Sequence, residues 1–402
     1  MISRWTALLL GLFALCAPVS VALGNITAVL ILITGVGLAV FSAEHRRHLP
    51  PRNILLALGA LFLTHLLGTA LSAPGPVQWH KFPEEMWFKL FLVTVPLLAA
   101  GRPRVIEKAM GVLLAVGALA AFYAVVQFFT GQDLIRHRTL DATMGYFIAT
   151  SFHGHHLSYG GQVMLVFVLA LAWLRQTLLT RPRLLWAPLL LCLLLGFGLI
   201  FSFARSAQLG ALAGSIYLVL TLPRNWRRWG GGLLLVVMIA TVAVPMVRHR
   251  IVEGFTDEKE VTRPNLWRSS LAGIADRPLR GWGQGNFDRL LAEHEVAGFY
   301  ESRAHSHNDY LMHAVNAGLP GLAAALWLLM AVLVFLHTGW RRTGSGSWVV
   351  AGAASAQIAV AVAGFFQVFQ TDDEPEMMLY FILGCGVAHL LGARRGAGQL
   401  SP

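Results

Sequence analysis

The sequence predicts an all-α polytopic membrane protein with about twelve transmembrane helices and one large helical loop outside the bilayer. Apolar residues make up 56% of the 402 residues, charged residues make up 13%, and the mean hydropathy is +0.62. A soluble domain carries about a quarter charged residues, so the bilayer is the expected solvent. A helix needs roughly 20 apolar residues to cross the hydrocarbon layer. Such runs lie near residues 5–23, 24–42, 53–72, 86–101, 109–129, 157–174, 184–202, 205–222, 230–247, 319–337, 348–366 and 378–393.

These runs divide the chain into three parts. Residues 1–247 are expected to hold the first nine transmembrane helices, and residues 319–402 the last three. Between them, residues 248–318 form the one long polar insertion. The first run follows Arg4 as the apolar core of a signal peptide would, but a second apolar run comes at once, and we expect the first to be retained.

The distribution of positive charge predicts the orientation in the membrane. With the N-terminus placed in the cytoplasm, the inner connections carry 17 Lys and Arg residues and only two acidic residues. Cytoplasmic loops are enriched in Lys and Arg, so we expect both termini in the cytoplasm and the insertion on the outer face. The net charge of +11 then reflects topology and contact with anionic membrane lipids, and we expect no binding to nucleic acid.

The first helix expected in the insertion covers residues 264–275. Pro264 stands in its first turn, a position that tolerates the missing N–H of proline. Leu266, Leu271 and Ile274 supply part of an apolar stripe.

Two further helices are expected in the insertion. The turn-rich stretch 276–286 ends the first helix, and a second covers residues 287–296. A third helix begins near Ser306 or Asn308, either of which can cap it, and stops at Gly318 before a proline.

A cluster of histidines surrounds the start of this third helix. His307 lies at or near the helix N-terminus, where the positive end of the helix dipole disfavours imidazolium and leaves a neutral ring that can accept a proton. The first turn also offers N–H groups that suit a phosphate oxygen. His305 and His313 are candidates to assist. The alternative is that His307 is a capping or interfacial residue with no chemical role.

The same cluster allows a metal site as an alternative interpretation. His305, His307, Asp309 and His313 are all potential ligands, and residues 153–156 carry three more histidines. However, the two closest histidines are two residues apart at a helix start and point in different directions, which is poor geometry for a tetrahedral ion. We therefore expect no metal and no other cofactor.

Several arginines are candidates to bind an anion on the outer face. Arg205 follows an apolar run at a depth where a guanidinium needs an anion or water, and its forked donors match phosphate oxygens. Arg263 and Arg268 flank Trp267, and Arg303 precedes the histidines. Each is alternatively a solvated or lipid-facing charge. The sequence has no Asp-x-Asp motif, which favours a reaction in which arginines alone stabilise a leaving diphosphate.

Together these features resemble the O-antigen ligase and polymerase superfamily of bacterial envelopes. Arg205 stands in a Ser-x-x-Arg context after a mid-chain span. The insertion runs from an Arg-Trp helix through Arg277–Phe287 to the pattern His-x-His-Asn-x-x-Leu at His305–Leu311, before a span that starts with Gly-Leu-Pro-Gly at Gly318–Gly321. By motif the resemblance covers residues 200–325.

This resemblance implies a GT-C-like fold in the bacterial inner membrane and transfer of a glycan from undecaprenyl diphosphate on the periplasmic face. Arg205 and Arg263 are implied to hold the diphosphate. His307 is implied to activate the acceptor hydroxyl, assisted by His305 or His313. Direct attack by the hydroxyl predicts inversion at the anomeric carbon.

The acceptor distinguishes members of the superfamily. It is a lipid A–core sugar in ligases, another lipid-linked repeat unit in polymerases and a protein hydroxyl in O-oligosaccharyltransferases. We expect a ligase, because the chain shows no additional C-terminal periplasmic domain of the kind that many protein-glycosylating relatives carry. Asn316 departs from the family pattern, which often has a glutamate there, so no role for that acid carries over.

Two other classes of function fit a polytopic protein. A transporter of lipid-linked glycans predicts ionisable residues buried in mid-span and broken helices around a central site, whereas here the polar residues gather at the outer end. A membrane scaffold that binds an anionic lipid or an envelope partner would tolerate substitution of the histidines.

Overall fold

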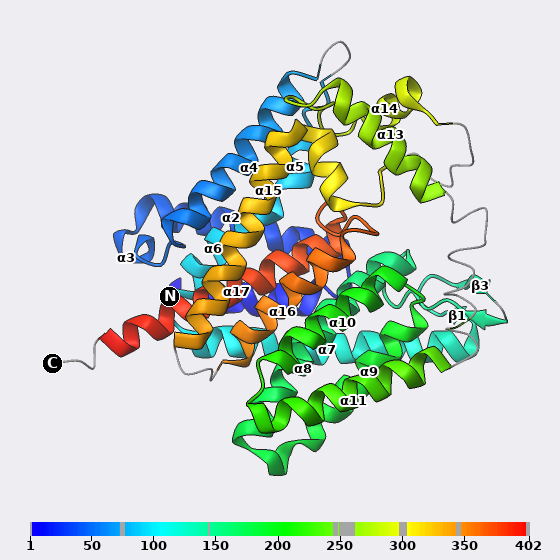
Figure 1. Cartoon of the computed structure of the whole chain (residues 1–402). Helices are drawn as coiled ribbons and strands as arrows, with labels where there is room; N and C mark the ends of the chain where they lie inside the picture. The colour runs from blue at the N-terminus through cyan, green and yellow to red at the C-terminus, as the bar shows by residue number, and fades with distance from the viewer. Residues whose placement is uncertain are drawn as a thin grey trace.

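The computed structural model of the chain describes residues 2–72, 77–143, 145–243, 262–296, 304–342 and 347–398, together with Arg248. The described part is a helical bundle, with α13 and α14 at one end and the chain's C-terminus at the opposite end (Figure 1). In chain order the helices are α1 (Ile2–Cys16), α2 (Val21–Phe41), α3 (Ala43–Arg46), α4 (Arg52–Ala70), α5 (Lys81–Met86), η1 (Trp87–Leu90), α6 (Phe91–Ala99), α7 (Pro103–Thr130), α8 (His156–Thr180), η2 (Pro182–Leu184), α9 (Trp186–Phe201), α10 (Arg205–Leu220), α11 (Arg224–Ala243), α13 (Thr262–Asp276), α14 (Phe287–His294), α15 (Asp309–Arg342), α16 (Trp348–Ala363) and α17 (Asp373–Gly398).

The lengths and composition of these helices confirm an all-α polytopic membrane protein. Six of the described helices are long and apolar enough to cross a bilayer, namely α2, α4, α7, α8, α15 and α17. Three shorter ones of 10–17 residues are also apolar, namely α1, α9 and α16. The count of about twelve spans stays a prediction.

Helix boundaries follow local breakers more closely than they follow apolar runs. The break expected between residues 23 and 24 is wrong, because α1 ends at Cys16 and α2 begins at Val21. Pro18 lacks the N–H that a continuing helix needs, and the Ser20 hydroxyl caps α2 by accepting from the Leu23 N–H at 3.4 Å.

The helices differ in how deeply they are buried. The apolar window of α17 is 89% buried, whereas that of α2 is 33% buried, so α17 is central and α2 is peripheral. Small residues let central helices approach closely. A Cβ at Gly210 of α10 would lie 2.5 Å from the Ala359 carbonyl oxygen of α16, and one at Gly214 would lie 2.8 Å from the Ser355 hydroxyl.

The third helix of the insertion is interrupted at Gly318, where the sequence predicts that it stops. α15 continues past Gly318 to Arg342 with a kink, and Ala317 and Gly318 are its non-helical residues. Gly318 adopts φ 67° and ψ −172°, a conformation that is essentially restricted to glycine. Pro320, which follows, cannot donate a helical hydrogen bond. The Gly-Leu-Pro signal therefore separates two helical segments that α15 combines across a kink.

Two small hairpins depart from the purely helical prediction. β1 (Gln132–Asp133) pairs with β2 (Arg138–Thr139), and β3 (Ala142–Thr143) pairs with β4 (Tyr146–Phe147), both antiparallel. They lie between α7 and α8, and Figure 1 shows them at an edge of the bundle, away from the C-terminus.

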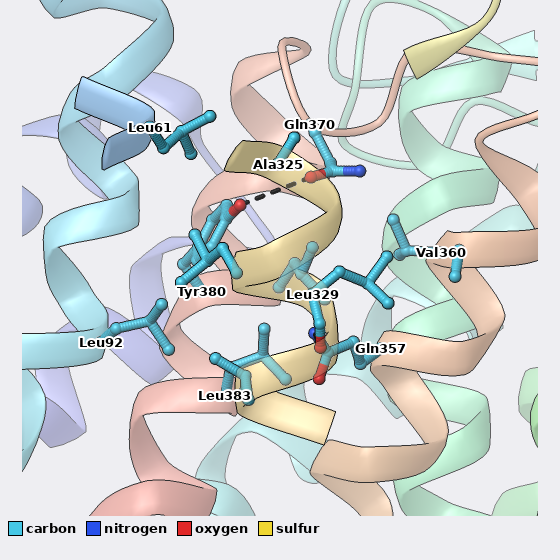
Figure 2. Close-up of a pocket in the computed structure, with 13 residues that line it drawn as sticks. Leu61, Leu92, Ala325, Leu329, Gln357, Val360, Gln370, Tyr380 and Leu383 are labelled. Atoms are coloured by element: carbon cyan, nitrogen blue, oxygen red, sulfur yellow. Dashed lines mark hydrogen bonds between the residues drawn. The ribbon is translucent and has the colours of Figure 1, made fainter. Parts of the chain in front are cut away.

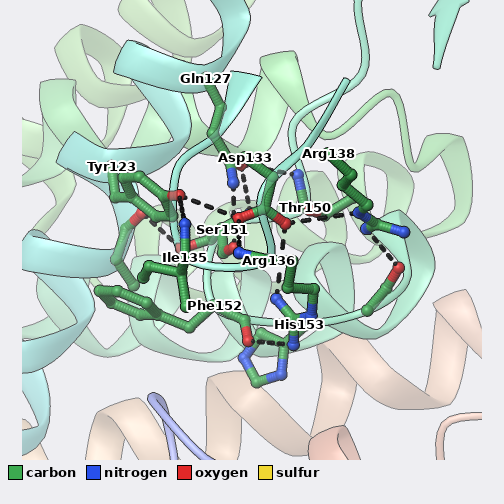
Figure 3. A network of polar contacts seen from close by, with 12 residues as sticks. Tyr123, Gln127, Asp133, Ile135, Arg136, Arg138, Thr150, Ser151, Phe152 and His153 are labelled. Atoms are coloured by element: carbon green, nitrogen blue, oxygen red, sulfur yellow. Dashed lines mark hydrogen bonds and ion pairs between the residues drawn. The ribbon is translucent and has the colours of Figure 1, made fainter. Parts of the chain in front are cut away.

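A polar network fixes this hairpin loop to the end of α7 (Figure 3). The buried Asp133 carboxylate accepts from the Tyr123 hydroxyl at 2.9 Å and forms ion pairs with Arg136 and Arg138 at 3.6 and 3.5 Å. The Gln127 side-chain oxygen accepts from the Ser151 N–H at 2.6 Å. These contacts fix the backbone that leads into the first turn of α8.

We expect Gly318→Ala to destabilise the protein by at least about 1–3 kcal/mol, the cost of holding a non-glycine residue in such a conformation. The added methyl group would also lie 2.6 Å from the Leu279 carbonyl carbon. Thermal unfolding of the purified protein in detergent measures the effect.

Gly59→Ala is the matched control, because a Cβ there meets nothing within 4 Å. In a helix interior that change is neutral or favourable by up to about 1 kcal/mol. Equal melting temperatures for the two variants would contradict the kink argument.

Candidate functional site

His305 and His307 lie side by side just before α15. Their ring centroids are 4.2 Å apart, and the His307 N–H donates to His305 Nδ1 at 3.3 Å. Because His305 Nδ1 accepts this bond, the ring proton of His305 is on Nε2. The Trp267 indole N–H donates to the Ser306 carbonyl at 3.0 Å and thereby fixes α13 to this segment.

The surroundings of His305 keep its imidazole neutral. Burial, together with the charges of His307, Arg263 and His155, lowers the pKa of His305 to about 3. His305 is therefore a hydrogen-bond donor at neutral pH rather than an acid–base group. Arg263, at the start of α13, and His155, at the start of α8, are therefore near enough for their charges to act on His305.

His307 is held by a residue that the sequence did not predict. Its Nδ1 lies 2.6 Å from the side-chain oxygen of the buried Gln367. An amide oxygen only accepts, so Nδ1 carries the proton and Nε2 keeps the lone pair that can take a proton from a substrate. His307 also has φ 50°, an unusual left-handed backbone for a non-glycine residue.

The start of α15 fixes the position of both histidines. The Asn308 side chain accepts from the Leu311 N–H at 3.0 Å, so Asn308 is the cap, as one of the two predicted options had it. The buried Asp309 carboxylate accepts from the backbone N–H groups of Phe369 and Gln370, both at 3.0 Å. This clamp holds the segment that carries Gln367 against the helix start.

The expectation that the first turn of this helix offers free N–H groups to a phosphate is wrong in part. The Asp309 N–H donates to the Gly364 carbonyl at 2.8 Å, and the Leu311 N–H is taken by the Asn308 cap. Since the protein itself occupies these donors, side chains have to supply most of the contacts to an anion.

Arg205 is the first residue of α10, and its helix start packs on the start of α8. His156 Nδ1 donates to the Ser202 carbonyl at 2.8 Å, and Gly160 leaves no room for a side chain beside Ala204. His155, the N-cap of α8, is near enough to His305 for its charge to lower the pKa of His305, which connects the packed starts of α8 and α10 to the histidine segment.

The other two candidate arginines are placed differently. Arg268 is exposed and lies five positions after Arg263 in α13, which turns the two side chains about 140° apart. The two arginines therefore lie on different sides of α13. Arg303 lies outside the described residues.

His313 is separated from the other two histidines. It lies one turn into α15, is buried, and its Nδ1 lies 3.1 Å from Nε2 of the buried His65 in α4. His313 therefore belongs to the packing of α15 on α4 and not to the pair of His305 and His307.

The alternative of a metal site finds no support in the described part of the chain. Within it, no three His, Cys, Asp or Glu side chains are grouped so as to hold an ion. Asp309 and His313 are engaged elsewhere, and His153 is buried 4.0 Å from Glu374, away from His155.

A network of buried charges connects the site to the rest of the bundle. Lys89 and Glu376 are fully buried and form an ion pair at 2.5 Å, and the Lys89 ammonium also donates to the Glu85 and Gln370 carbonyls at 2.5 and 3.1 Å. Burying one of these charges alone would be costly, so each requires the other. The network joins η1 and α17 to Gln370, whose N–H is one of the two that donate to the Asp309 carboxylate.

Glu85 brings a carboxylate to Asn316, the position where the family pattern often has an acid. The Asn316 and Gln284 side-chain amides donate to the same Glu85 oxygen, at 3.0 and 3.2 Å. Burial raises the pKa of Glu85 to about 7, although the charge of Lys89 and the Gln284 hydrogen bond oppose the shift. Sequence reasoning missed this contact, which joins residues 231 positions apart.

A small cavity lies in the core beneath the clamp (Figure 2). Its volume is about 20 Å³, and it is lined mainly by leucines of α4, α6, α15 and α17. Gln370 and Tyr380 stand at one end, joined at 3.5 Å. A cavity of this size holds about one water molecule, so it is too small for a lipid chain.

Comparison with known families points to the same part of the chain. Residues 190–326 match the family model described as O-Antigen ligase. The matched segment runs from α9 to the first half of α15 and contains Arg205, Arg263, His305 and His307. No curated protein matches the chain.

We expect Glu85→Gln to remove a loss of stability at high pH. A carboxyl with a raised pKa contributes stability that is fully present below its unfolded value of about 4.5 and is lost as the pH rises through about 7. A neutral amide still accepts from Asn316 and Gln284. The variant should therefore exceed the wild type at pH 8 by on the order of 1–3 kcal/mol and match it near pH 4.5.

Thermal unfolding at the two pH values tests this. Glu84→Gln is the control, because Glu84 is exposed and pairs only at the surface with Lys81. A pH dependence that Glu85→Gln leaves unchanged would show that this carboxyl does not titrate with folding.

Proposed function

We propose that this chain, which carries the O-antigen ligase match in residues 190–326, transfers an O-antigen glycan from undecaprenyl diphosphate to a lipid A–core acceptor. The family implies a lipid-linked glycan and membrane lipids as substrates, and the reaction takes place on the periplasmic face of the inner membrane. The observation that carries the proposal is the His307–Gln367 pair, which lies next to His305, a residue whose pKa the charge of Arg263 helps to lower.

His307 acts as the general base in this proposal. The hydrogen bond from Nδ1 to the Gln367 oxygen orients the ring and leaves Nε2 to take the proton of the acceptor hydroxyl. The hydroxyl oxygen forms the new bond to the anomeric carbon, the bond from that carbon to the diphosphate oxygen breaks, and its electron pair leaves with the diphosphate. One direct displacement inverts the anomeric centre.

Arginines stabilise the leaving diphosphate. Arg263 approaches from the first turn of α13 and Arg205 from the first turn of α10, so two guanidinium groups on separate helices can hold the two phosphoryl groups. His305 donates from Nε2 to an oxygen of the donor. Exposed Arg268 contacts the donor further out, and Arg303, which precedes the histidines in the sequence, is proposed to do the same.

Lipopolysaccharide from a deletion strain separates the members of the superfamily. Full-length lipid-linked chains beside bare core indicate a ligase. Single repeat units attached to core indicate a polymerase, and unaltered lipopolysaccharide with an unglycosylated protein indicates an O-oligosaccharyltransferase.

We expect His307→Ala to lower the rate of glycan transfer about 10²- to 10⁴-fold, the usual contribution of a general base. Gln367→Leu, which removes the oxygen that fixes the tautomer, should lower it less. Complementing the deletion strain with each variant and comparing lipopolysaccharide at equal membrane levels gives the readout.

His80→Ala is the control for these variants, because His80 is an exposed histidine outside the cluster. Wild-type transfer by His307→Ala would remove this residue from the mechanism. Transfer that is lost in EDTA and restored by a divalent ion would overturn the metal-free reaction.

Arg205→Ala and Arg263→Ala should each reduce transfer about 10- to 100-fold, since a hydrogen bond to a charged group contributes about 1.5–3 kcal/mol. Arg268→Ala, at an exposed position, should reduce transfer less. Arg280→Ala, at another exposed position of the insertion, should leave transfer unchanged. In vitro transfer from purified lipid-linked donor ranks the four variants. Equal activity of Arg263→Ala and Arg280→Ala would contradict the diphosphate assignment.

A further inference from the structure

A second cavity, which is lined by polar residues, lies at the opposite end of the bundle from the histidines. The ends of α8 and α15 and the connection between α10 and α11 enclose about 400 Å³. Three arginines line it, Arg175, Arg227 and Arg341, together with His337 and Trp340. A rise of 1.5 Å per residue puts Arg175 about 28 Å along α8 from His156. This distance matches the thickness of the hydrocarbon layer, about 30 Å, so the cavity lies at the depth of the other layer of headgroups.

A hydrogen bond and a cation–π contact fix the side chain of Arg175 in this cavity. Its side chain is 7% exposed, one guanidinium nitrogen donates to the Thr221 carbonyl at 2.7 Å, and the guanidinium lies 4.8 Å from the centre of the Trp340 ring. Its Nε is buried without a hydrogen-bond partner. A buried guanidinium with an unused donor is costly unless an anion meets it.

Among the described residues that line this cavity, none carries a carboxylate. The sequence contains no Asp or Glu in residues 142–252 or 310–371, so α8, α9, α10, α11 and α16 lack acids, and α15 has none after its first residue. Among the described residues, none of the three arginines forms an ion pair with an acidic side chain. The positive charge of the three arginines is therefore available to an external anion, and the buried Nε of Arg175 is a donor that such an anion could use.

We propose that this cavity binds a phosphate group, carried by an anionic phospholipid or free in solution. Arginine guanidinium groups bind phosphate oxygens in pairs of parallel hydrogen bonds, and His337, which contacts the Tyr217 hydroxyl at 3.0 Å, adds a further polar group. Leu179, Leu220 and Leu222 line the rest of the cavity and suit the apolar part of a lipid. The site is distinct from the transfer site and does not depend on it.

The test is ligand-dependent stabilisation of the purified, delipidated protein in a neutral detergent. Dioctanoyl phosphatidylglycerol should raise the melting temperature with increasing concentration, and dioctanoyl phosphatidylcholine should not. A shift produced by inorganic phosphate as well identifies free phosphate as a sufficient ligand, whereas a shift with phosphatidylglycerol alone identifies the lipid headgroup.

Arg227→Gln with Arg341→Gln should weaken this binding about tenfold or more, because two charge-assisted hydrogen-bonding groups are lost. Arg175→Gln should do the same, but its burial makes the double variant the safer test of a folded protein. Arg183→Gln, which changes an exposed arginine of η2 that does not line the cavity, is the control. The proposal would be overturned if none of these ligands raised the melting temperature. It would also be overturned if the rise in melting temperature persisted unchanged in the double variant.

Discussion

The buried carboxylate of Asp309 is the contact on which the site depends. It accepts from two successive backbone N–H groups, those of Phe369 and Gln370, while its own N–H donates to the Gly364 carbonyl. A carboxylate buried without such partners would be strongly unfavourable, so these three bonds fix residues 364–370 against the start of α15. This is what places Gln367 opposite His307, although the two lie 60 residues apart in sequence.

The clamp continues into the bundle through charge. The Gln370 carbonyl accepts from Lys89, whose ammonium pairs with Glu376, so the segment beside the histidines is joined to η1 and α17. A buried pair of this kind contributes little net stability but makes alternative packings costly, because each would leave a charge alone. Acids and bases therefore meet at the end of the bundle that carries the histidines, whereas at the opposite end no acid among the described residues pairs with Arg175, Arg227 or Arg341.

Local signals in the sequence predicted where helices begin, but they could not predict contacts between residues far apart in the sequence. Pro264 and Asn308 mark helix starts by backbone chemistry that acts within one turn, and both predictions are confirmed. The Glu85–Asn316 and His307–Gln367 contacts join different helices, and an apolar pattern does not specify which polar groups meet. Leu271 shows the same limit, since it fits the predicted stripe but is exposed while Leu266 is buried.

Among the described residues, the insertion (residues 248–318) has an apolar core distinct from the main core of the bundle, and Val368 of the clamped segment completes it. Leu266, Trp282 and Phe287 pack in one cluster with Val315 of α15 and Val368 of the clamped segment. Backbone bonds reinforce this packing, since the Trp282 N–H donates to the Val315 carbonyl at 2.7 Å and the Leu319 N–H to the Pro278 carbonyl at 2.7 Å. Arg263 thus reaches the histidines only when α13 is docked on the bundle. The kink at Gly318 makes room for that docking. A strained backbone conformation away from the reacting groups therefore determines whether Arg263 and His307 come together.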